Sequence, residues 1–221
     1  MRGLLFLLAL ALLPAPAVQA QPGADRFVSA PLAQAEARAI ATYGPFRVLD
    51  ARTAAMVEAT DEDSPAQFRA MVRDFPALAT LRIVECPGTY DDRANLALGR
   101  LIRAAGLETE VPAGGSVRSG GVELVLAGVT RTIDDEAEFA VHAWEDEDGL
   151  QAGDYPSDSP ENAKYLAYYR EMGLADPRGF YAMTNSAPFD DALWLSGAEM
   201  RRWIEGGAPR LAYLDLGEAL P

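Results

Sequence analysis

The sequence predicts an α/β fold, with a mostly parallel core sheet and helices outside it. Runs with strand-like patterns alternate along the chain with runs of helical spacing, as in layered α/β proteins. Glycine or proline stands at most junctions between these runs, where turns are expected. About 201 of the 221 residues remain if the first 20 are removed, which is enough for one domain with its own core.

The first 20 residues have the features of a secretory signal peptide. Met1-Arg2 supplies a positive start, residues 4–13 form an unbroken apolar run, and small residues precede a cleavage site after Ala20. An apolar run of this length is too short to span a bilayer. We therefore expect an exported protein, periplasmic or secreted, that is soluble and free of the membrane after cleavage. The expected organisation is a signal peptide at 1–20, a leader and N-terminal helix at 21–45, the main domain at 46–205 and a C-terminal tail at 206–221.

The expected strands and helices follow from periodicity and capping residues. Ser64 before Pro65 and Asp91 before an apolar-spaced run are typical helix starts, and Gly106 is a typical helix end. Strands are expected at 47–50, 54–59, 78–85, 107–111 and 138–144. Helices are expected at 33–43, 64–75, 91–106, 119–127, 161–172, 177–184 and 195–203. The acidic stretch 145–159, which carries glycines and prolines, is expected to be a flexible loop.

The composition excludes several kinds of partner and cofactor. Cleavage would remove Arg2 and leave 18 Lys and Arg against 33 Asp and Glu, a net charge of about −15. Such a surface repels nucleic acid and anionic lipid, so neither is an expected partner. One cysteine, Cys86, and one histidine, His142, cannot form a His/Cys metal site or an internal disulfide. No Walker or dinucleotide-binding glycine pattern is present, so neither a metal nor a cofactor is expected.

The stretch from Gly114 to Gly128 carries the strongest functional signal. It places Ser119 at a glycine-flanked turn before an apolar helix, and His142 follows in the next strand pattern. A serine hydroxyl is a poor nucleophile unless a neutral imidazole takes its proton. Unpaired N–H groups at the start of a helix can stabilise the oxyanion that then develops. The pair therefore predicts serine hydrolase chemistry.

Three motifs in this order resemble the Clp protease proteolytic subunit and the wider Clp/crotonase fold, and most of all uncharacterised exported proteins of that fold. The resemblance runs over residues 47–203 and implies repeated β-β-α units around the core sheet. Cys86-Pro87-Gly88-Thr89 is similar to the Ser-Pro-Gly-Gly turn after a core strand. The stretch from Ser119-Gly120-Gly121 to Ala127-Gly128 is similar to the nucleophile helix, and Val141-His142 to the histidine after an apolar strand.

These motifs imply a catalytic role for five residues. Ser119 would attack, His142 would act as general base and then acid, and Asp191 would orient the His142 ring. The N–H groups of Gly88 and Gly120 would hold the oxyanion. Two positions depart from the family pattern: Thr89 replaces the second glycine of the turn, and Asp191 is one position out of register with the Leu195-Ser196 helix start. The alternatives for the orienting residue are Asp190, Asn185 and none, which would leave a Ser-His dyad.

Most of these residues also have a structural interpretation. Ser119 could cap the following helix, with Ser116 the competing serine in the preceding loop, and His142 could be a hydrogen-bonded core residue. The tyrosines could line a groove or simply pack between helices; they are Tyr165, Tyr168, Tyr169 and Tyr181. Cys86 is expected to be a small buried apolar residue, and the acidic residues 145–148 a solvated loop rather than a calcium site.

Two further functional hypotheses compete with an exported peptidase-like hydrolase. One is a catalytically inactive binding or scaffold protein, favoured by Thr89 and the uncertain third residue. The other is crotonase-type thioester chemistry, which the expected export disfavours, since coenzyme A thioesters are cytoplasmic. The expected substrate is a peptide or another acyl compound. Homo-oligomerisation is expected from the resemblance, and no ATPase partner is expected outside the cytoplasm.

Overall fold

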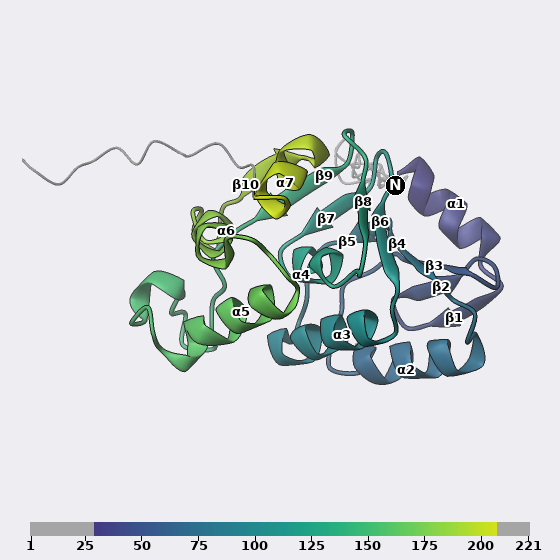
Figure 1. Cartoon of the computed structure of the whole chain (residues 1–221), viewed down its shortest axis with the longest axis horizontal. Coiled ribbons are helices and arrows are strands. Elements are labelled where there is room, and N and C mark those ends of the chain that lie inside the picture. The colour runs from purple at the N-terminus through teal and green to yellow at the C-terminus, as the bar shows by residue number, and fades with distance from the viewer. Residues whose placement is uncertain (1–28, 207–221) are drawn as a thin grey trace, which may run out of the picture.

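The computed structural model describes residues 29–206 and contains two β-sheets with helices packed around them (Figure 1). The helices are α1 (Ala30–Arg38), α2 (Ser64–Asp74), α3 (Asp92–Ala104), α4 (Gly121–Leu126), α5 (Pro160–Glu171), α6 (Pro177–Thr184) and α7 (Gly197–Ile204), with a 3₁₀ turn, η1 (Ala152–Asp154). The strands are β1 (Ala41–Tyr43), β2 (Phe46–Val48), β3 (Thr53–Met56), β4 (Thr80–Ile83), β5 (Glu85–Cys86), β6 (Glu108–Val111), β7 (Ser116–Arg118), β8 (Arg131–Ile133), β9 (Glu138–Val141) and β10 (Leu193–Ser196). The predicted α/β class, with mostly parallel strands, is confirmed.

The larger sheet has the order β1-β2-β3-β4-β6-β8 and the smaller one the order β10-β9-β7-β5. Strands β3, β4, β6 and β8 are parallel, as are β5, β7 and β9. The antiparallel pairs among the described strands are β1-β2 and β2-β3 in the larger sheet and β10-β9 in the smaller one. The three strands of the larger sheet that continue into the smaller sheet, β4, β6 and β8, are therefore parallel to one another.

Two β-β-α units follow each other along the chain. In each unit the first strand joins the larger sheet, the second joins the smaller sheet, and a helix follows: β4-β5-α3 and β6-β7-α4. The pair β8-β9 repeats the same step between sheets. This is the arrangement that the Clp/crotonase resemblance implies. Its consequence is that β5, β7 and β9 end side by side, at one edge of the smaller sheet.

Three local predictions were wrong, each because pairing between strands overrides local preference. The expected helix 33–43 ends at Arg38, because residues 41–43 pair with residues 46–48 in a hairpin turning at Gly44, whose φ is +53°. The expected strand 78–85 is two strands, since the chain leaves the larger sheet at Val84. Strands β7, β8 and β10 were missed. The hairpin also shows that the boundary expected after residue 45 falls inside the larger sheet.

Several helix starts lie where capping residues predicted them. The Asp91 side chain accepts from Ala94 N at the start of α3, and Ser196 and Glu199 form a capping box at the start of α7. Helix α2 begins at Ser64 with Asp63 as its N-cap, one residue before the predicted cap. The residues of α4 are all buried, because this helix packs against α3, β6 and β7. Such a buried helix draws its stability from packing rather than from length.

The stretch 145–159 is tied to the rest of the molecule, although a flexible loop was predicted. The Tyr155 hydroxyl donates to the Asp146 carboxylate, and the Tyr155 ring lies 5.5 Å from the Trp144 ring. The Asn162 side chain donates to the carbonyls of Ala152 and Pro156. These bonds hold the loop against α5.

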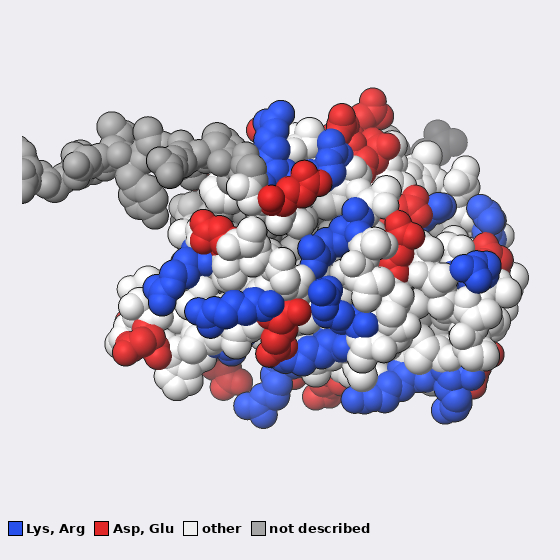
Figure 2. All heavy atoms as spheres, viewed as in Figure 1, with Lys and Arg blue, Asp and Glu red and all other residues white. Residues whose placement is uncertain are grey.

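Other expectations concern residues at the two ends of the chain. The predicted signal peptide at 1–20, and nearly all of the tail at 206–221, lie outside the described residues. Within residues 29–206 no helix is long and apolar enough to cross a membrane. On the face shown in Figure 2, Lys and Arg side chains are interspersed with Asp and Glu, so the acidic excess of the chain is not gathered there.

Candidate active site

The predicted site residues lie at the carboxyl ends of three adjacent parallel strands. Strand β5 pairs with β7 so that Cys86 faces Val117, and β7 pairs with β9 so that Val117 faces Phe139. Continuing this register, Gly88 follows β5 level with Ser119, and His142 follows β9 one position further. Parallel strands present their carboxyl ends at one edge, where open α/β folds bind ligands. The topology thus brings together Gly88, Ser119, Gly120 and His142.

Ser119 occupies a backbone conformation that non-glycine residues rarely adopt. Its φ is +47°, and among residues 29–206 it is the only non-glycine residue with a positive φ. Its N–H donates to Ala140 O (2.9 Å), and its carbonyl accepts from Val122 N (3.0 Å). These two bonds hold the strained turn between β7 and α4 in place. Strain of this kind is concentrated at functional sites.

The Ser119 hydroxyl does not cap the following helix, contrary to the structural alternative. The N-cap of α4 is Gly120, with no side-chain capping bond, and within the described part of the chain Ser119 Oγ makes no hydrogen bond. Ser116 is the first residue of β7 and contacts Glu138 Oε1 at 3.4 Å rather than loop backbone. Of these two serines, Ser119, which follows directly after β7, is therefore the one whose hydroxyl makes no hydrogen bond.

Helix α3 anchors the Gly120 carbonyl, which belongs to the second peptide after Ser119. The Asn95 side chain donates to Gly120 O (2.7 Å) and accepts from the Thr60 hydroxyl (2.9 Å), and Asn95 is buried. Glycine is required at position 120, since a Cβ there would lie 2.6 Å from Thr89 Cγ2. Thr89, a departure from the family pattern, thus packs directly under the serine turn.

Both predicted oxyanion donors are unpaired backbone groups. Among the bonds formed by residues 29–206, neither Gly88 N nor Gly120 N donates to any acceptor. Gly88 has a φ of +137°, and a Cβ placed on it would lie 3.2 Å from Ser119 Cβ and 3.6 Å from Ser119 Oγ. Only glycine tolerates that conformation. The turn after β5 therefore lies directly against the Ser119 side chain.

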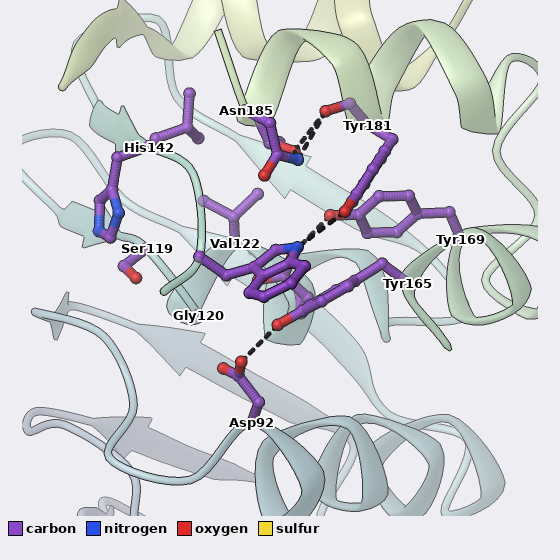
Figure 3. A pocket seen from close by; sticks show the side chains of 13 residues that line it. Asp92, Ser119, Gly120, Val122, His142, Tyr165, Tyr169, Tyr181 and Asn185 are labelled. Atoms are coloured by element: carbon purple, nitrogen blue, oxygen red, sulfur yellow. Dashed lines mark hydrogen bonds between the residues drawn. The ribbon is translucent and has the colours of Figure 1, made fainter. Parts of the chain in front are cut away.

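His142 has its partner on the main chain. Its Nδ1 lies 2.8 Å from Ala143 O, and its ring meets the Phe189 ring edge to face, with centroids 5.1 Å apart. A carbonyl oxygen can only accept, so Nδ1 carries the proton and Nε2 of the neutral ring is the free base. Among the described residues no hydrogen bond joins His142 to Ser119 Oγ. Both residues line one pocket, at the same end of it (Figure 3).

The structure does not bring Asp191 to His142. Asp191 is exposed, and its carboxylate accepts from Ala192 N (2.7 Å), because the chain turns there from Pro188. Asp190 is exposed as well. Asn185 lines the pocket, but its side-chain nitrogen donates to Tyr181 O (2.8 Å) rather than to the histidine. The hydrogen-bond partner of His142 Nδ1 is thus the Ala143 carbonyl and not one of the side chains predicted to orient the ring.

The pocket contains two carboxyl groups that no sequence motif marked as site residues. Asp92 and Glu123 line it together with Trp144 and the tyrosines Tyr165, Tyr169 and Tyr181. Asp92 and the three tyrosines are labelled in Figure 3. Tyr169 donates to Glu123 Oε1 at 2.7 Å, and Tyr165 donates to Asp92. The only signal for Glu123 was an acidic residue inside an apolar run. Of the two interpretations of the tyrosines, the groove holds for these three, whereas Tyr168 packs in the core and does not line the pocket.

Burial controls the ionisation of several of these groups. It raises the pKa of Glu123 to about 7, since a carboxylate loses its hydration there. Burial and the nearby Glu123 also raise the pKa of Tyr169 well above its usual value. The Cys86 thiol is buried under the Gly121 Cα, and its pKa rises to about 12 for the same reason, so it stays protonated. Cys86 therefore has the structural role predicted for it.

A metal site is not visible in the described part of the chain. Within residues 29–206 no group of three or more His, Cys, Asp and Glu side chains is arranged to hold an ion. Asp146, in the acidic loop, accepts from the N–H groups of Asp148 and Leu150, as in an ordinary polar turn.

Comparisons with known proteins give a limited result. No protein-family model matches the chain, and no curated protein is significantly similar to it in sequence. Among solved structures it is similar to a mutant of the 1510-N membrane-bound stomatin-specific protease in complex with a substrate peptide. The identity is 14% and the TM-score 0.42, over 70% of this chain and 73% of that one. The chemistry of the site therefore has to follow from its own residues and their geometry.

Proposed function

We propose that the chain is an exported serine hydrolase of peptidase type that works through a covalent acyl-enzyme. The observation that carries the proposal is the strained Ser119, whose free hydroxyl lies beside two unpaired N–H groups in the pocket that His142 also lines. A backbone distorted at a serine, with donors beside it, fits a nucleophile better than a structural residue.

In the proposed reaction, Ser119 Oγ attacks the substrate carbonyl carbon while His142 Nε2 takes the hydroxyl proton. The electron pair of the carbonyl moves to its oxygen, where the N–H groups of Gly88 and Gly120 stabilise the negative charge. Collapse of this intermediate breaks the bond to the leaving group, which receives the proton from His142. Water then attacks the acyl-enzyme carbonyl carbon and gives a proton to the same nitrogen. The bond to Ser119 Oγ breaks, the acid leaves, and His142 returns the proton to Ser119 Oγ.

The Ala143 carbonyl gives His142 the orientation that an aspartate gives in a triad. It holds the Nδ1–H tautomer, which directs the lone pair of Nε2 toward proton transfer. A neutral carbonyl stabilises the imidazolium less than a carboxylate does. The site is therefore a Ser-His dyad supported by the main chain. The imidazole must close on Ser119 when substrate binds, as catalytic hydrogen bonds often do.

The test is a fluorophosphonate probe applied to the purified mature protein. We expect labelling of the wild type, none of Ser119→Ala, and at least about a hundredfold slower labelling of His142→Ala. Ser116→Ala is the matched control, since this serine lies on the preceding strand and should leave labelling unchanged. Equal labelling of wild type and Ser119→Ala would disprove the assigned nucleophile. Mass spectrometry of the modified peptide identifies the residue directly.

One observation favours the alternative, a non-catalytic binding protein. The Ser119 hydroxyl and the His142 ring are not hydrogen bonded to one another, and Asp191 lies elsewhere. In that case the pocket would bind a peptide without cleaving it. Measurable turnover that is lost in His142→Ala would exclude this alternative, whereas a tightly bound peptide recovered intact would support it.

The proposed export is tested separately from catalysis. The apolar N-terminal run and Ala20 support cleavage of a signal peptide. Expression of the full chain should give a mature protein that begins at Gln21 in the periplasm or medium, as seen by N-terminal sequencing. Recovery of the uncleaved chain in the cytoplasm would contradict export while leaving the hydrolase chemistry to its own test.

A further inference from the structure

The pocket beside Ser119 contains more hydrogen-bond acceptors than donors. Glu123 and Asp92 each use one oxygen to accept from a tyrosine, and within the described residues the second oxygen of each has no partner. Asn185 Oδ1 is buried and also lacks a partner, while its nitrogen is committed to Tyr181 O and Thr184 Oγ1. A buried acceptor without a donor is costly, so Asn185 Oδ1 in particular fits a ligand that supplies a donor.

Among residues 29–206 no Lys or Arg side chain forms an ion pair with either of the two carboxyl groups. Every ion pair among residues 29–206 involves other acidic residues, and neither Asp92 nor Glu123 takes part in one. Glu123 is 7% exposed, so solvent screens its charge poorly. Buried carboxylates are normally paired. A ligand with a positive charge would complete the pairing.

The aromatic walls of the pocket are suited to the same ligand. Trp144 stacks on Tyr165 (centroids 6.2 Å apart), and Tyr165 stacks on Tyr181 (5.9 Å apart). The only lysine of the chain, Lys164, lies with its ammonium group 5.5 Å from the Trp144 ring and 5.0 Å from the Tyr165 ring. The fold thus already holds one cation against these rings, as expected for electron-rich aromatic faces.

The donors of this wall are already used within the protein. The Trp144 indole N–H donates to the Tyr181 hydroxyl (2.7 Å), which donates to Asn162 Oδ1 (2.5 Å). Tyr165 and Tyr169 donate to the two carboxyl groups. This side of the pocket therefore presents aromatic ring faces and carboxylate oxygens to a ligand, and its N–H and O–H donors are already bonded within the protein. An acidic or purely apolar side chain would leave the carboxyl groups unpaired.

We infer that this pocket is the specificity site of the proposed hydrolase, and that it selects a lysine or arginine side chain on the residue that supplies the scissile carbonyl. The inference rests on the proposed function, since it places that carbonyl at Ser119. The pocket leads from Ser119 and His142 at one end to Asp92 and the tyrosines at the other (Figure 3). A long basic side chain would pass Trp144 and bring its charge to Asp92 and Glu123.

The test compares two peptide substrates that differ only at this residue, one with lysine and one with norleucine, which has the same carbon stem and no charge. We expect the wild type to prefer lysine in kcat/KM by at least about tenfold, since pairing a buried carboxylate is worth that much or more. In Glu123→Gln and Asp92→Asn the preference should fall toward one. The exposed Glu62→Gln is the matched control and should keep the wild-type preference.

The experiment separates the pocket from the catalytic assignment. Fluorophosphonate labelling of the wild type and of the exposed control Glu62→Gln tests Ser119 alone, because a small probe carries no side chain for this pocket. Normal labelling, together with equal use of both peptides by the wild type or an unchanged preference in both variants, would overturn the specificity site and leave the hydrolase intact.

Binding to Ser119→Ala provides a second measurement that needs no turnover. Calorimetry should show the lysine peptide binding more tightly than the norleucine peptide, and the difference should shrink when Glu123→Gln is added. If the wild type shows no labelling at all, the hydrolase proposal fails. Equal affinity for the two peptides would then overturn the basic-side-chain pocket as well, whereas a clear preference for lysine would keep it as a binding site.

Discussion

Asn95 on α3 joins the serine turn to the loop before α2, since its side chain donates to Gly120 O at 2.7 Å and accepts from the Thr60 hydroxyl at 2.9 Å. Asn95 and Thr60 are both buried. The orientation of the Gly120–Gly121 peptide, which is next to the peptide that carries the predicted donor Gly120 N–H, therefore depends on one amide side chain from a different β-β-α unit. A change at Asn95 should reach the reaction through the position of the oxyanion donor.

Asn95→Asp should weaken both stability and catalysis. The substitution keeps the size of the side chain but puts an acceptor against the Gly120 carbonyl. We expect the free energy of unfolding to fall by about 1–3 kcal/mol, the usual cost of an unsatisfied buried polar pair. Labelling of Ser119 should slow by about tenfold or more at saturating probe. Denaturant unfolding and labelling rates measure the two effects, and wild-type rates in a folded Asn95→Asp protein would show that the contact does not position the turn.

Asp191→Asn should have little effect on activity. The Asp191 carboxylate accepts from Ala192 N, and His142 Nδ1 is held by Ala143 O instead. A true orienting aspartate costs about 10⁴-fold in kcat when changed to asparagine. We expect less than about threefold here. A loss of several orders of magnitude in steady-state turnover would show that Asp191 swings onto His142 in the substrate complex.

Ser119→Gly should stabilise the protein while it removes activity. Serine at a φ of +47° is strained, and glycine adopts this conformation freely. We expect Ser119→Gly to be more stable than Ser119→Ala by about 0.5–1 kcal/mol, because alanine keeps the Cβ and with it the strain. Both variants should fail to react with fluorophosphonate. Equal midpoints in thermal unfolding would mean that the turn stores no strain.

The stability of the protein should depend on pH through Glu123. Its pKa is about 7 in the folded state, raised by burial above the ordinary value of 4.5. Between these two values the folded state holds the proton more tightly than the unfolded state does, so stability is greatest below pH 4.5 as far as this group is concerned. It should fall as the pH rises from about 4.5 to 7, by up to about 3 kcal/mol.

Glu123→Gln is the control for this pH dependence. The variant keeps an acceptor for the Tyr169 hydroxyl but cannot ionise. The difference in unfolding free energy between wild type and variant, measured by denaturant titration at each pH, should therefore change through this window and level off above it. A difference that stays constant from pH 4 to 8 would show that Glu123 does not titrate with a raised pKa.

Much of the site could be predicted because its parts are local. Gly88, Ser119 and Gly120 stand in turns that glycine makes possible, and His142 follows an apolar strand, so short motifs in a fixed order were enough to select them. The role of Ser119 as a helix cap was also a local alternative. The structure decided against a capping role for Ser119, because the N-cap of α4 is Gly120 and no side chain caps this helix.

The acidic pocket could not be predicted from such motifs. Asp92 looks like an ordinary residue of a helix start, and Glu123 like the polar position of a short apolar helix. Their common surroundings arise only because α3, α4, α5 and α6 meet beside the ends of β7 and β9. Likewise, no spacing in the sequence shows that Asp191 is exposed or that His142 Nδ1 contacts the Ala143 carbonyl, because both depend on how the loops fold.

By itself the sequence determined the alternation of strands and helices, the capping of α3 and α7, and the order of the turn, serine and histidine motifs, since all of these depend on neighbours along the chain. The tertiary structure alone decided that the strands divide into two sheets, which partner holds His142, and that two carboxyl groups face one aromatic pocket. Those features depend on free energies of burial and pairing between distant segments, which exist only once the chain has folded.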